Sequence, residues 1–333
     1  MNNTMHKKHV FSLPPALLNE QGTMRRVGFE LEFTGVELED VAQDVAALYG
    51  GAVSRRSSFV YEISGTRFGD FTLEVDASQL KSEKYKEFLA DLGVRLEPDT
   101  ARSLDSLLLK LASVAVPFEL VMPPVPLDEL NELRPLESML RRRAARGTRD
   151  SLLYAFAMQF NPELPSFRPQ DILDHMRAFF VLQQWLEQEI DVDISRRLSP
   201  FIDSFPEKYV RMVLHADYTP DQNRLIDDYL RYNPTRNRPL DMTCAFAFLD
   251  AGRVMSRVEE PHLVKPRPTF HYRMPDCRID EPAWSMALEW NRWVSVEQLA
   301  ADKTELRRVC DAFLATPPGL GCLLSELGEW LSR

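Results

Sequence analysis

The sequence predicts an α+β fold in which helices pack on the apolar face of a β-sheet. Short segments of alternating apolar and polar residues predict the strands, and longer segments with helical spacing of apolar residues separate them. Hydrophobic residues make up 44% of the 333 residues, which is enough to fill a large core. We expect an N-terminal arm over residues 1–24 and a single domain over residues 25–333, with a helical and loop insertion at about residues 191–243.

The first predicted strand, Val27–Phe33, is apolar on one face and acidic on the other. Its apolar face consists of Val27, Phe29, Leu31 and Phe33, and its polar face consists of Gly28, Glu30 and Glu32. A helix is predicted to follow this strand and to end at Gly50 and Gly51, because glycine readily leaves helical geometry. The strand therefore combines a core-forming side with a chemically active side.

The next two predicted strands, Phe59–Ile63 and Phe71–Asp76, form an antiparallel hairpin around a loop over residues 64–70. The second strand repeats the pattern of the first, since its polar face carries Glu74 and Asp76.

A single carboxylate, Glu119, lies in the predicted strand Pro117–Met122. Two helices are predicted before this strand, near Lys81–Leu92 and Leu104–Val114, and the prolines at 123, 124 and 126 are predicted to end it. The following segment, Leu127–Arg146, is helical in composition, and Pro135 is predicted to kink or split it.

Two later strands also carry polar side chains on one face. The segment Leu153–Asn161 presents Gln159 and Asn161, and the segment Thr269–Met274 presents His271 and Arg273. The helices of this half are predicted at Ile172–Ile190, where His175 is interpreted as a packed histidine, and at about residues 281–300 and 303–331, where Trp284, Trp290 and Trp293 are expected in the core.

The acidic groups suggest a metal and phosphate site if their strands are neighbours. One strand alone could simply present its polar face to solvent, but several strands share this pattern of one apolar and one polar face. Converging carboxylates repel one another unless cations neutralise them, and their oxygen atoms suit Mg²⁺ bound together with substrate phosphates rather than a soft metal. The residues concerned are Glu30, Glu32, Glu74, Asp76, Glu119, Gln159 and Asn161.

Phosphoryl chemistry also needs positive charge, and Arg273 is predicted to face the same way as the acids. A basic loop contributes Arg231, Arg236 and Arg238, which either bind phosphate or a substrate carboxylate or form surface salt bridges. The sequence contains neither a P-loop nor a Rossmann glycine motif, so a nucleotide site of those types is not expected.

Composition narrows the class of partner. The formal net charge of −10 opposes binding to nucleic acid and to anionic membranes, and no apolar run approaches the ~20 residues that cross a bilayer. The four cysteines lack Cys-x-x-Cys spacing, and the N-terminus lacks an apolar signal core. We therefore expect a cytoplasmic protein that acts on small molecules or peptides.

Four of these segments follow one another in a characteristic order. They are Arg26-Val-Gly-Phe-Glu-Leu-Glu-Phe33, Phe71-Thr-Leu-Glu-Val-Asp76, Phe118-Glu-Leu-Val-Met-Pro123 and the strand Tyr154–Asn161. In this order, spread over residues 25–300, they resemble the amidoligase family of the glutamine synthetase and glutamate–cysteine ligase superfamily.

The resemblance implies an antiparallel catalytic sheet that binds ATP and Mg²⁺ and forms an acyl phosphate, which an amine then attacks to give an amide. The substrates implied are a carboxylate and an amine on an amino acid or a peptide. Carried over by position, the resemblance implies metal ligation by Glu30, Glu32 and Glu119, a role in metal or amine binding for Glu74 and Asp76, phosphate contacts by Gln159 and Asn161, and stabilisation of the transferred phosphoryl group by Arg273.

The chain departs from the family pattern at one motif. It reads His271-Tyr-Arg273 where the pattern has a glutamate two residues before the arginine. An imidazole also binds metal but prefers softer ions, so His271 is predicted as a changed metal ligand. Two alternatives stay open at this point: a metal-dependent phosphoesterase or nuclease, and a nucleotide-binding relative without turnover.

Overall fold

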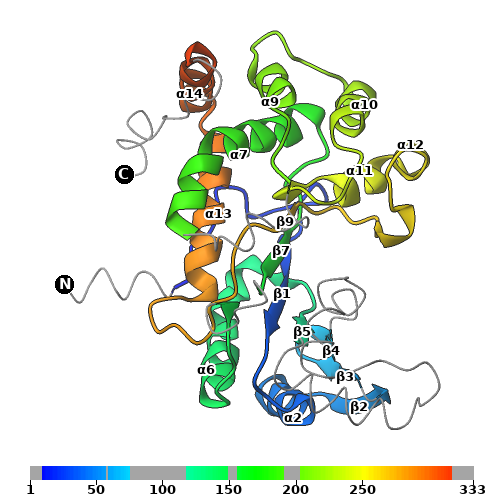
Figure 1. Cartoon of the computed structure of the whole chain (residues 1–333), viewed down its shortest axis with the longest axis vertical. Coiled ribbons are helices and arrows are strands. Elements are labelled where there is room, and N and C mark those ends of the chain that lie inside the picture. Colours follow the sequence, from blue (N-terminus) through cyan, green and yellow to red (C-terminus); the bar gives the residue numbers. More distant parts are fainter. Residues whose placement is uncertain (1–9, 58, 76–117, 149–155, 191–202, 317–333) are drawn as a thin grey trace, which may run out of the picture.

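The computed structural model describes residues 10–57, 59–75, 118–148, 156–190 and 203–316, and within them it shows an α+β fold built on one antiparallel sheet (Figure 1). The strands run in the order β2-β3-β4-β5-β1-β7-β9-β8, and β6 also pairs with β1. The nine strands of these ranges are β1 (Arg26–Phe33), β2 (Ala52–Ser57), β3 (Val60–Thr66), β4 (Gly69–Val75), β5 (Phe118–Val121), β6 (Val125–Pro126), β7 (Met158–Pro162), β8 (Leu240–Asp241) and β9 (His271–Tyr272).

Helices pack against this sheet, with the two long helices α7 and α13 lying side by side along one side of it (Figure 1). The helices of the described ranges are α2 (Leu38–Tyr49), η1 (Leu127–Leu133), α6 (Arg134–Arg142), α7 (Pro169–Ile190), α9 (Glu207–Leu214), α10 (Gln222–Tyr232), α11 (Thr243–Leu249), α12 (Ala251–Met255), η3 (Pro261–Leu263), α13 (Met286–Ala301) and α14 (Lys303–Ala315). No helix among the described residues is both long enough and apolar enough to cross a bilayer.

Strand β1 forms the centre of the core, and its predicted alternation is confirmed. The side chains of Val27, Phe29, Leu31 and Phe33 are all fully buried. Phe29 packs edge to face on Trp290 of α13, with 6.3 Å between the ring centroids, so the apolar face of the sheet is covered by this helix. The expectation that Trp290 and Trp293 belong to the core is also confirmed.

The region after β1 follows the prediction with one addition. Helix α2 ends at Tyr49 with Gly50 as its C-cap, and both Gly50 and Gly51 have positive φ angles, +79° and +98°, as the predicted helix end requires. The hairpin forms between β3 and β4, but its strands reach Thr66 and Gly69, so the turn is shorter than the predicted loop. Strand β2 was not predicted, because its Ser and Arg residues on an exposed sheet edge lack an alternating apolar pattern.

The prediction that the prolines end the strand is confirmed, because β5 ends at Val121, just before Pro123 and Pro124. Val125 and Pro126 then form a separate two-residue strand, β6, which pairs with the start of β1, and proline is tolerated in so short a pairing. The predicted split of the next helix is confirmed: η1 is a 3-10 helix, and α6 begins with Pro135 in its first turn.

Strand β7 runs from Met158 to Pro162, and the predicted strand residues 153–155 lie outside the described residues. Strand β9 is shorter than predicted and contains only His271 and Tyr272, since Pro268 and Pro275 flank it. Helices α7, α13 and α14 are confirmed, whereas the predicted helices at Lys81–Leu92 and Leu104–Val114, and the predicted part of the last helix beyond residue 316, lie outside the described residues.

His175 of α7 is packed, as predicted. Its Nδ1 lies 2.7 Å from the carbonyl oxygen of Asp171, and its ring lies 5.1 Å from that of Phe270. Burial lowers the pKa of His175 below its ordinary value of 6.5, although Glu297 acts in the opposite direction.

Candidate functional site

Three glutamates stand in one row across the polar face of the sheet. Glu32 of β1 lies opposite Glu119 of β5, and Glu119 lies opposite Glu74 of β4. Neighbouring strands are about 4.8 Å apart, so three carboxylates occupy adjacent positions and their like charges repel one another. Glu74 and Glu119 are both half-buried. The register therefore brings together three residues that are far apart in the sequence.

A second row runs beside the first. Glu30 lies opposite Gln159 of β7, and Asn161 lies one pair further along, opposite Gly28. The amide nitrogen of Asn161 donates to Glu30 Oε1 over 2.9 Å. The amide oxygen, Oδ1 of Asn161, is buried and has no hydrogen-bond partner among the described residues. A buried oxygen without a hydrogen-bond donor is costly, and a bound cation beside it would remove that cost.

The two glutamates of β1 differ in their freedom to bind a ligand. Glu32 is 7% exposed, and its Oε2 accepts a hydrogen bond of 2.8 Å from the backbone N–H of Ala157. The side chain of Glu30 is 16% exposed and lies 4.0 Å from the guanidinium of Arg267. Ala157 therefore fixes the direction of Glu32, while Glu30 faces a more open and positively charged part of the site.

Strand β9 adds His271 to the same face, since its neighbour Tyr272 pairs with Phe160 on the apolar side. Nε2 of His271 lies 2.9 Å from Oε1 of Gln159, and Nδ1 lies 3.3 Å from Oδ2 of Asp241. Burial alone would lower the pKa of His271, but the bonds to Asp241 and Cys244 raise it above the ordinary 6.5.

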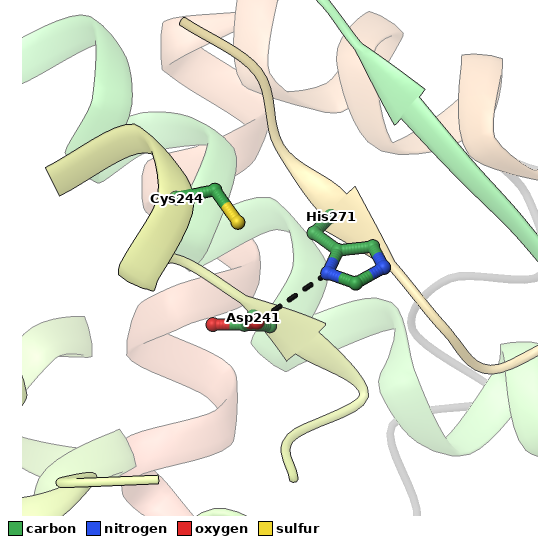
Figure 2. Close-up of side chains that lie close together, drawn as sticks. All are labelled: Asp241, Cys244 and His271. Carbon is green, nitrogen blue, oxygen red and sulfur yellow. Dashed lines mark hydrogen bonds and ion pairs between the residues drawn. The ribbon is translucent and has the colours of Figure 1, made fainter. Parts of the chain in front are cut away.

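Asp241, Cys244 and His271 form a compact buried group contributed by β8, α11 and β9 (Figure 2). Burial would raise the pKa of Asp241, but the bonds from His271 and Thr243 lower it below 3.8. Burial likewise raises the pKa of the Cys244 thiol, and the bond to His271 outweighs that effect, so the pKa falls below 9.0. The three buried side chains thus interact with one another through hydrogen bonds and through their charges.

The three arginines predicted in the basic loop lie in three environments, and Arg231 is not in the loop but in the last turn of α10. Arg238 is buried and donates to Asn233 Oδ1 and to the carbonyl oxygens of residues 203 and 204, so it supports the loop. Arg231 is exposed and lies over the ring of Tyr232, at 5.7 Å from its centroid. Arg236 reaches β8, with its Nε 3.8 Å from Oδ2 of Asp241.

Arg273 contacts the basic loop at Arg236. Its Nη1 donates to the carbonyl oxygen of Arg236 over 2.7 Å, which ties the end of β9 to the basic loop. Arg236, Arg267 and Arg273 therefore gather at the β9 end of the polar face, whereas Glu32, Glu74 and Glu119 lie toward β4. Asp76, the remaining predicted site residue, lies outside the described residues.

Sequence reasoning missed three residues of this site: Asp241, Cys244 and Arg267. Arg267 continues the alternation of Thr269 and His271 by one more step, so extending that pattern past Pro268 could have identified it. Asp241 and Cys244 had no such signal, because only the pairing of β8 with β9 brings them to His271.

Comparison with protein families matches residues 23–295 to the family described as "Putative amidoligase enzyme". No curated protein and no solved structure matches the chain. The matched segment begins just before β1 and ends within α13, so it includes both glutamate rows, the basic loop and β9. Because the match covers well over half of the chain, this protein belongs to the amidoligase family.

Proposed function

We propose that this protein is an ATP- and magnesium-dependent carboxylate–amine ligase that forms an amide through an acyl phosphate. Membership of the amidoligase family supports amide formation, and a sheet of the glutamine synthetase and glutamate–cysteine ligase type is part of the same proposal. The observation that carries the metal requirement is the row of Glu32, Glu119 and Glu74 on adjacent strands.

The donor set fits a hard cation. The glutamates offer oxygen atoms, and the unpartnered Oδ1 of Asn161 offers another beside Glu30. The glutamates are spread along two rows, which suits ions that keep part of their water and also bind phosphate oxygens. Bound Mg²⁺ would neutralise charge on the nucleotide phosphates and on these carboxylates.

The chain's own residues would act at two ends of the polar face. Glu30, Glu32, Glu74 and Glu119 of β1, β4 and β5 would hold Mg²⁺ and through it the nucleotide phosphates, with Gln159 and Asn161 beside them on β7. Asp76 would be a further metal ligand or amine contact. Arg273 and the neighbouring Arg236 place positive charge at the opposite end, where it stabilises the phosphoryl group in transfer.

In the proposed reaction, an oxygen of the substrate carboxylate bonds to the γ-phosphorus of ATP and ADP leaves. The amine nitrogen then bonds to the acyl carbon, phosphate leaves, and the amine proton passes to a nearby carboxylate such as Glu74. Among the predicted anion-binding residues, Arg238 supports the loop, and Arg231 remains exposed and available to a substrate carboxylate.

The test is incubation of the full chain with ATP, Mg²⁺ and pooled amino acids and peptides. ADP, phosphate and a new amide should form in equal amounts, and added hydroxylamine should trap the acyl phosphate as a hydroxamate. Hydrolysis of ATP without amide or hydroxamate would instead support a phosphoesterase, and ATP binding without any turnover would support a non-catalytic relative.

The matched variants are Glu119→Gln and Glu62→Gln. Glu62 lies on the same face of the sheet but on β3, where it accepts a hydrogen bond from Arg56. Glu119→Gln should lower metal-dependent turnover on the order of 100-fold because one of three aligned charges is lost. Glu62→Gln should keep it. Equal activity of the two variants, with both folded by circular dichroism, would contradict the proposed site.

A further inference from the structure

A second set of metal-binding atoms lies beside the proposed magnesium site. Asp241, Cys244 and His271 each offer one ligand atom, and these atoms lie within 4.8 Å of one another (Figure 2). Among the residues that the structure describes, this is the one group of three such side chains brought so close. It combines a carboxylate oxygen, a sulfur and an imidazole nitrogen.

Hydrogen bonding shows which nitrogen of His271 is available to bind a metal ion. Nε2 lies 2.9 Å from Oε1 of Gln159, and because an amide oxygen only accepts, Nε2 carries a hydrogen. In the neutral ring, Nδ1 then presents a lone pair to Asp241 and Cys244, which are acceptors when deprotonated. One proton at Nδ1 can be shared with only one of them, whereas a cation between the three would contact all of them.

The distances suit a small tetrahedral ion. Zinc bonds of ~2.0–2.1 Å to nitrogen and ~2.0–2.2 Å to oxygen place those two ligand atoms about 3.4 Å apart in a tetrahedron. The observed separation between Nδ1 of His271 and Oδ2 of Asp241 is 3.3 Å. The sulfur of Cys244 lies within 4.8 Å of both of these atoms, so it is placed to supply the third ligand.

Outer contacts orient two of the ligands. Oδ1 of Asp241 accepts from the backbone N–H of Thr243 over 2.8 Å and from its hydroxyl over 2.7 Å. Oδ2, which lies 3.3 Å from Nδ1 of His271 and 3.8 Å from Nε of Arg236, is therefore the oxygen that would face the ion. Gln159 orients the ring of His271 by accepting from its Nε2, as an outer hydrogen-bond partner typically does for a metal-ligating histidine. Thiolate and carboxylate together match a divalent charge, which matters because all three side chains are buried, and the guanidinium of Arg267 lies 4.0 Å from the sulfur.

We propose that Asp241, Cys244 and His271 bind one divalent transition metal, with Zn²⁺ the best match, at a site distinct from the glutamate rows. Thiolate and imidazole select this class of ion over Mg²⁺. The site joins two strands of only two residues each to the start of α11, so the bound ion fastens this edge of the sheet. The proposal is independent of the ligase reaction.

The experiment uses the purified full chain, stripped with a chelator and titrated with Co²⁺ as a spectroscopic substitute for zinc. One Co²⁺ per chain should produce an intense thiolate-to-cobalt absorption band in the near ultraviolet, and Zn²⁺ should remove the band by displacement. Excess Mg²⁺ should not. The absence of this band in the native chain would overturn the proposal without any variant.

Three variants identify the ligands. Cys244→Ser should abolish the band and weaken Zn²⁺ binding on the order of 100-fold or more. Cys310→Ser, which changes an equally buried thiol on α14, should retain both, and so should Glu119→Gln. A band that survives in Cys244→Ser or disappears in Glu119→Gln would refute the assignment. Amide formation with ATP is measured separately, so failure of either proposal is recognised on its own.

Discussion

The buried ion pair between Arg25 and Glu297 should be one of the most sensitive positions for stability. Both side chains are essentially inaccessible, with exposed fractions of 0% and 1%. The guanidinium makes two bonds to the carboxylate, of 2.7 and 2.8 Å, and Trp293 Nε1 donates a third over 2.8 Å. Arg25 also donates to the backbone oxygen of Glu163, which directly follows β7.

The substitution Glu297→Gln removes the negative charge and leaves Arg25 charged and buried. Breaking one partner of such a pair costs about 3–5 kcal/mol of unfolding free energy. For a domain of this size that corresponds to a decrease in melting temperature on the order of 10 °C. The matched control is Glu129→Gln, which breaks a pair of the same types at the same 2.7 Å but about half exposed, and it should cost less than about 1 kcal/mol.

Acid should reduce the difference between wild type and Glu297→Gln. Burial alone would raise the pKa of Glu297, but the charge and hydrogen bonds of Arg25 lower it below the ordinary 4.5. A lowered pKa in the folded state gives stability that is present above pH 4.5 and is lost as the pH falls through the folded value. Urea unfolding at pH 7 and below pH 4 measures this. A difference that grows on acidification, or a cost no larger than that of Glu129→Gln, would refute the reasoning.

Two further comparisons use stability as the readout. Replacing Arg238 by Met should cost roughly 2–4 kcal/mol in urea unfolding, because its buried bonds support the basic loop, whereas Arg231→Met on the surface should be neutral within error; equal effects would show that the loop does not depend on Arg238. Gly51→Ala should lower the melting temperature more than Gly50→Ala, since a Cβ at 51 would meet the carbonyl oxygen of Ser64 at 2.7 Å while a Cβ at 50 meets nothing within 4 Å; the reverse order would contradict the close approach.

The alternation of β1 could be predicted from the sequence because its period of two is fixed by the strand itself. Phe29 and Leu31 could only point to one side, and Glu30 and Glu32 to the other. The pairing of Glu32 with Glu119 and of Glu119 with Glu74 could not be derived in this way, since alternation gives the face of a residue but not its register or its neighbouring strand.

The other half of the site was harder to predict for a different reason. His271 belongs to a strand of two residues, and its partner Asp241 belongs to another equally short strand that follows a basic loop. Segments this short have no usable periodicity, and tertiary pairing alone decides their position. Cys244 follows Asp241 at the beginning of α11, so only the pairing of β8 with β9 shows that it lies beside His271.

The position of β5 between β4 and β1 has a consequence for folding. The hairpin of β3 and β4 forms from neighbouring residues, but the row of glutamates exists only after β5 has joined both β4 and the distant β1. Such non-local pairing is slow, because a long loop must close before any contact is gained. We therefore expect the carboxylates to come together late in folding, at a step that a divalent cation would accelerate.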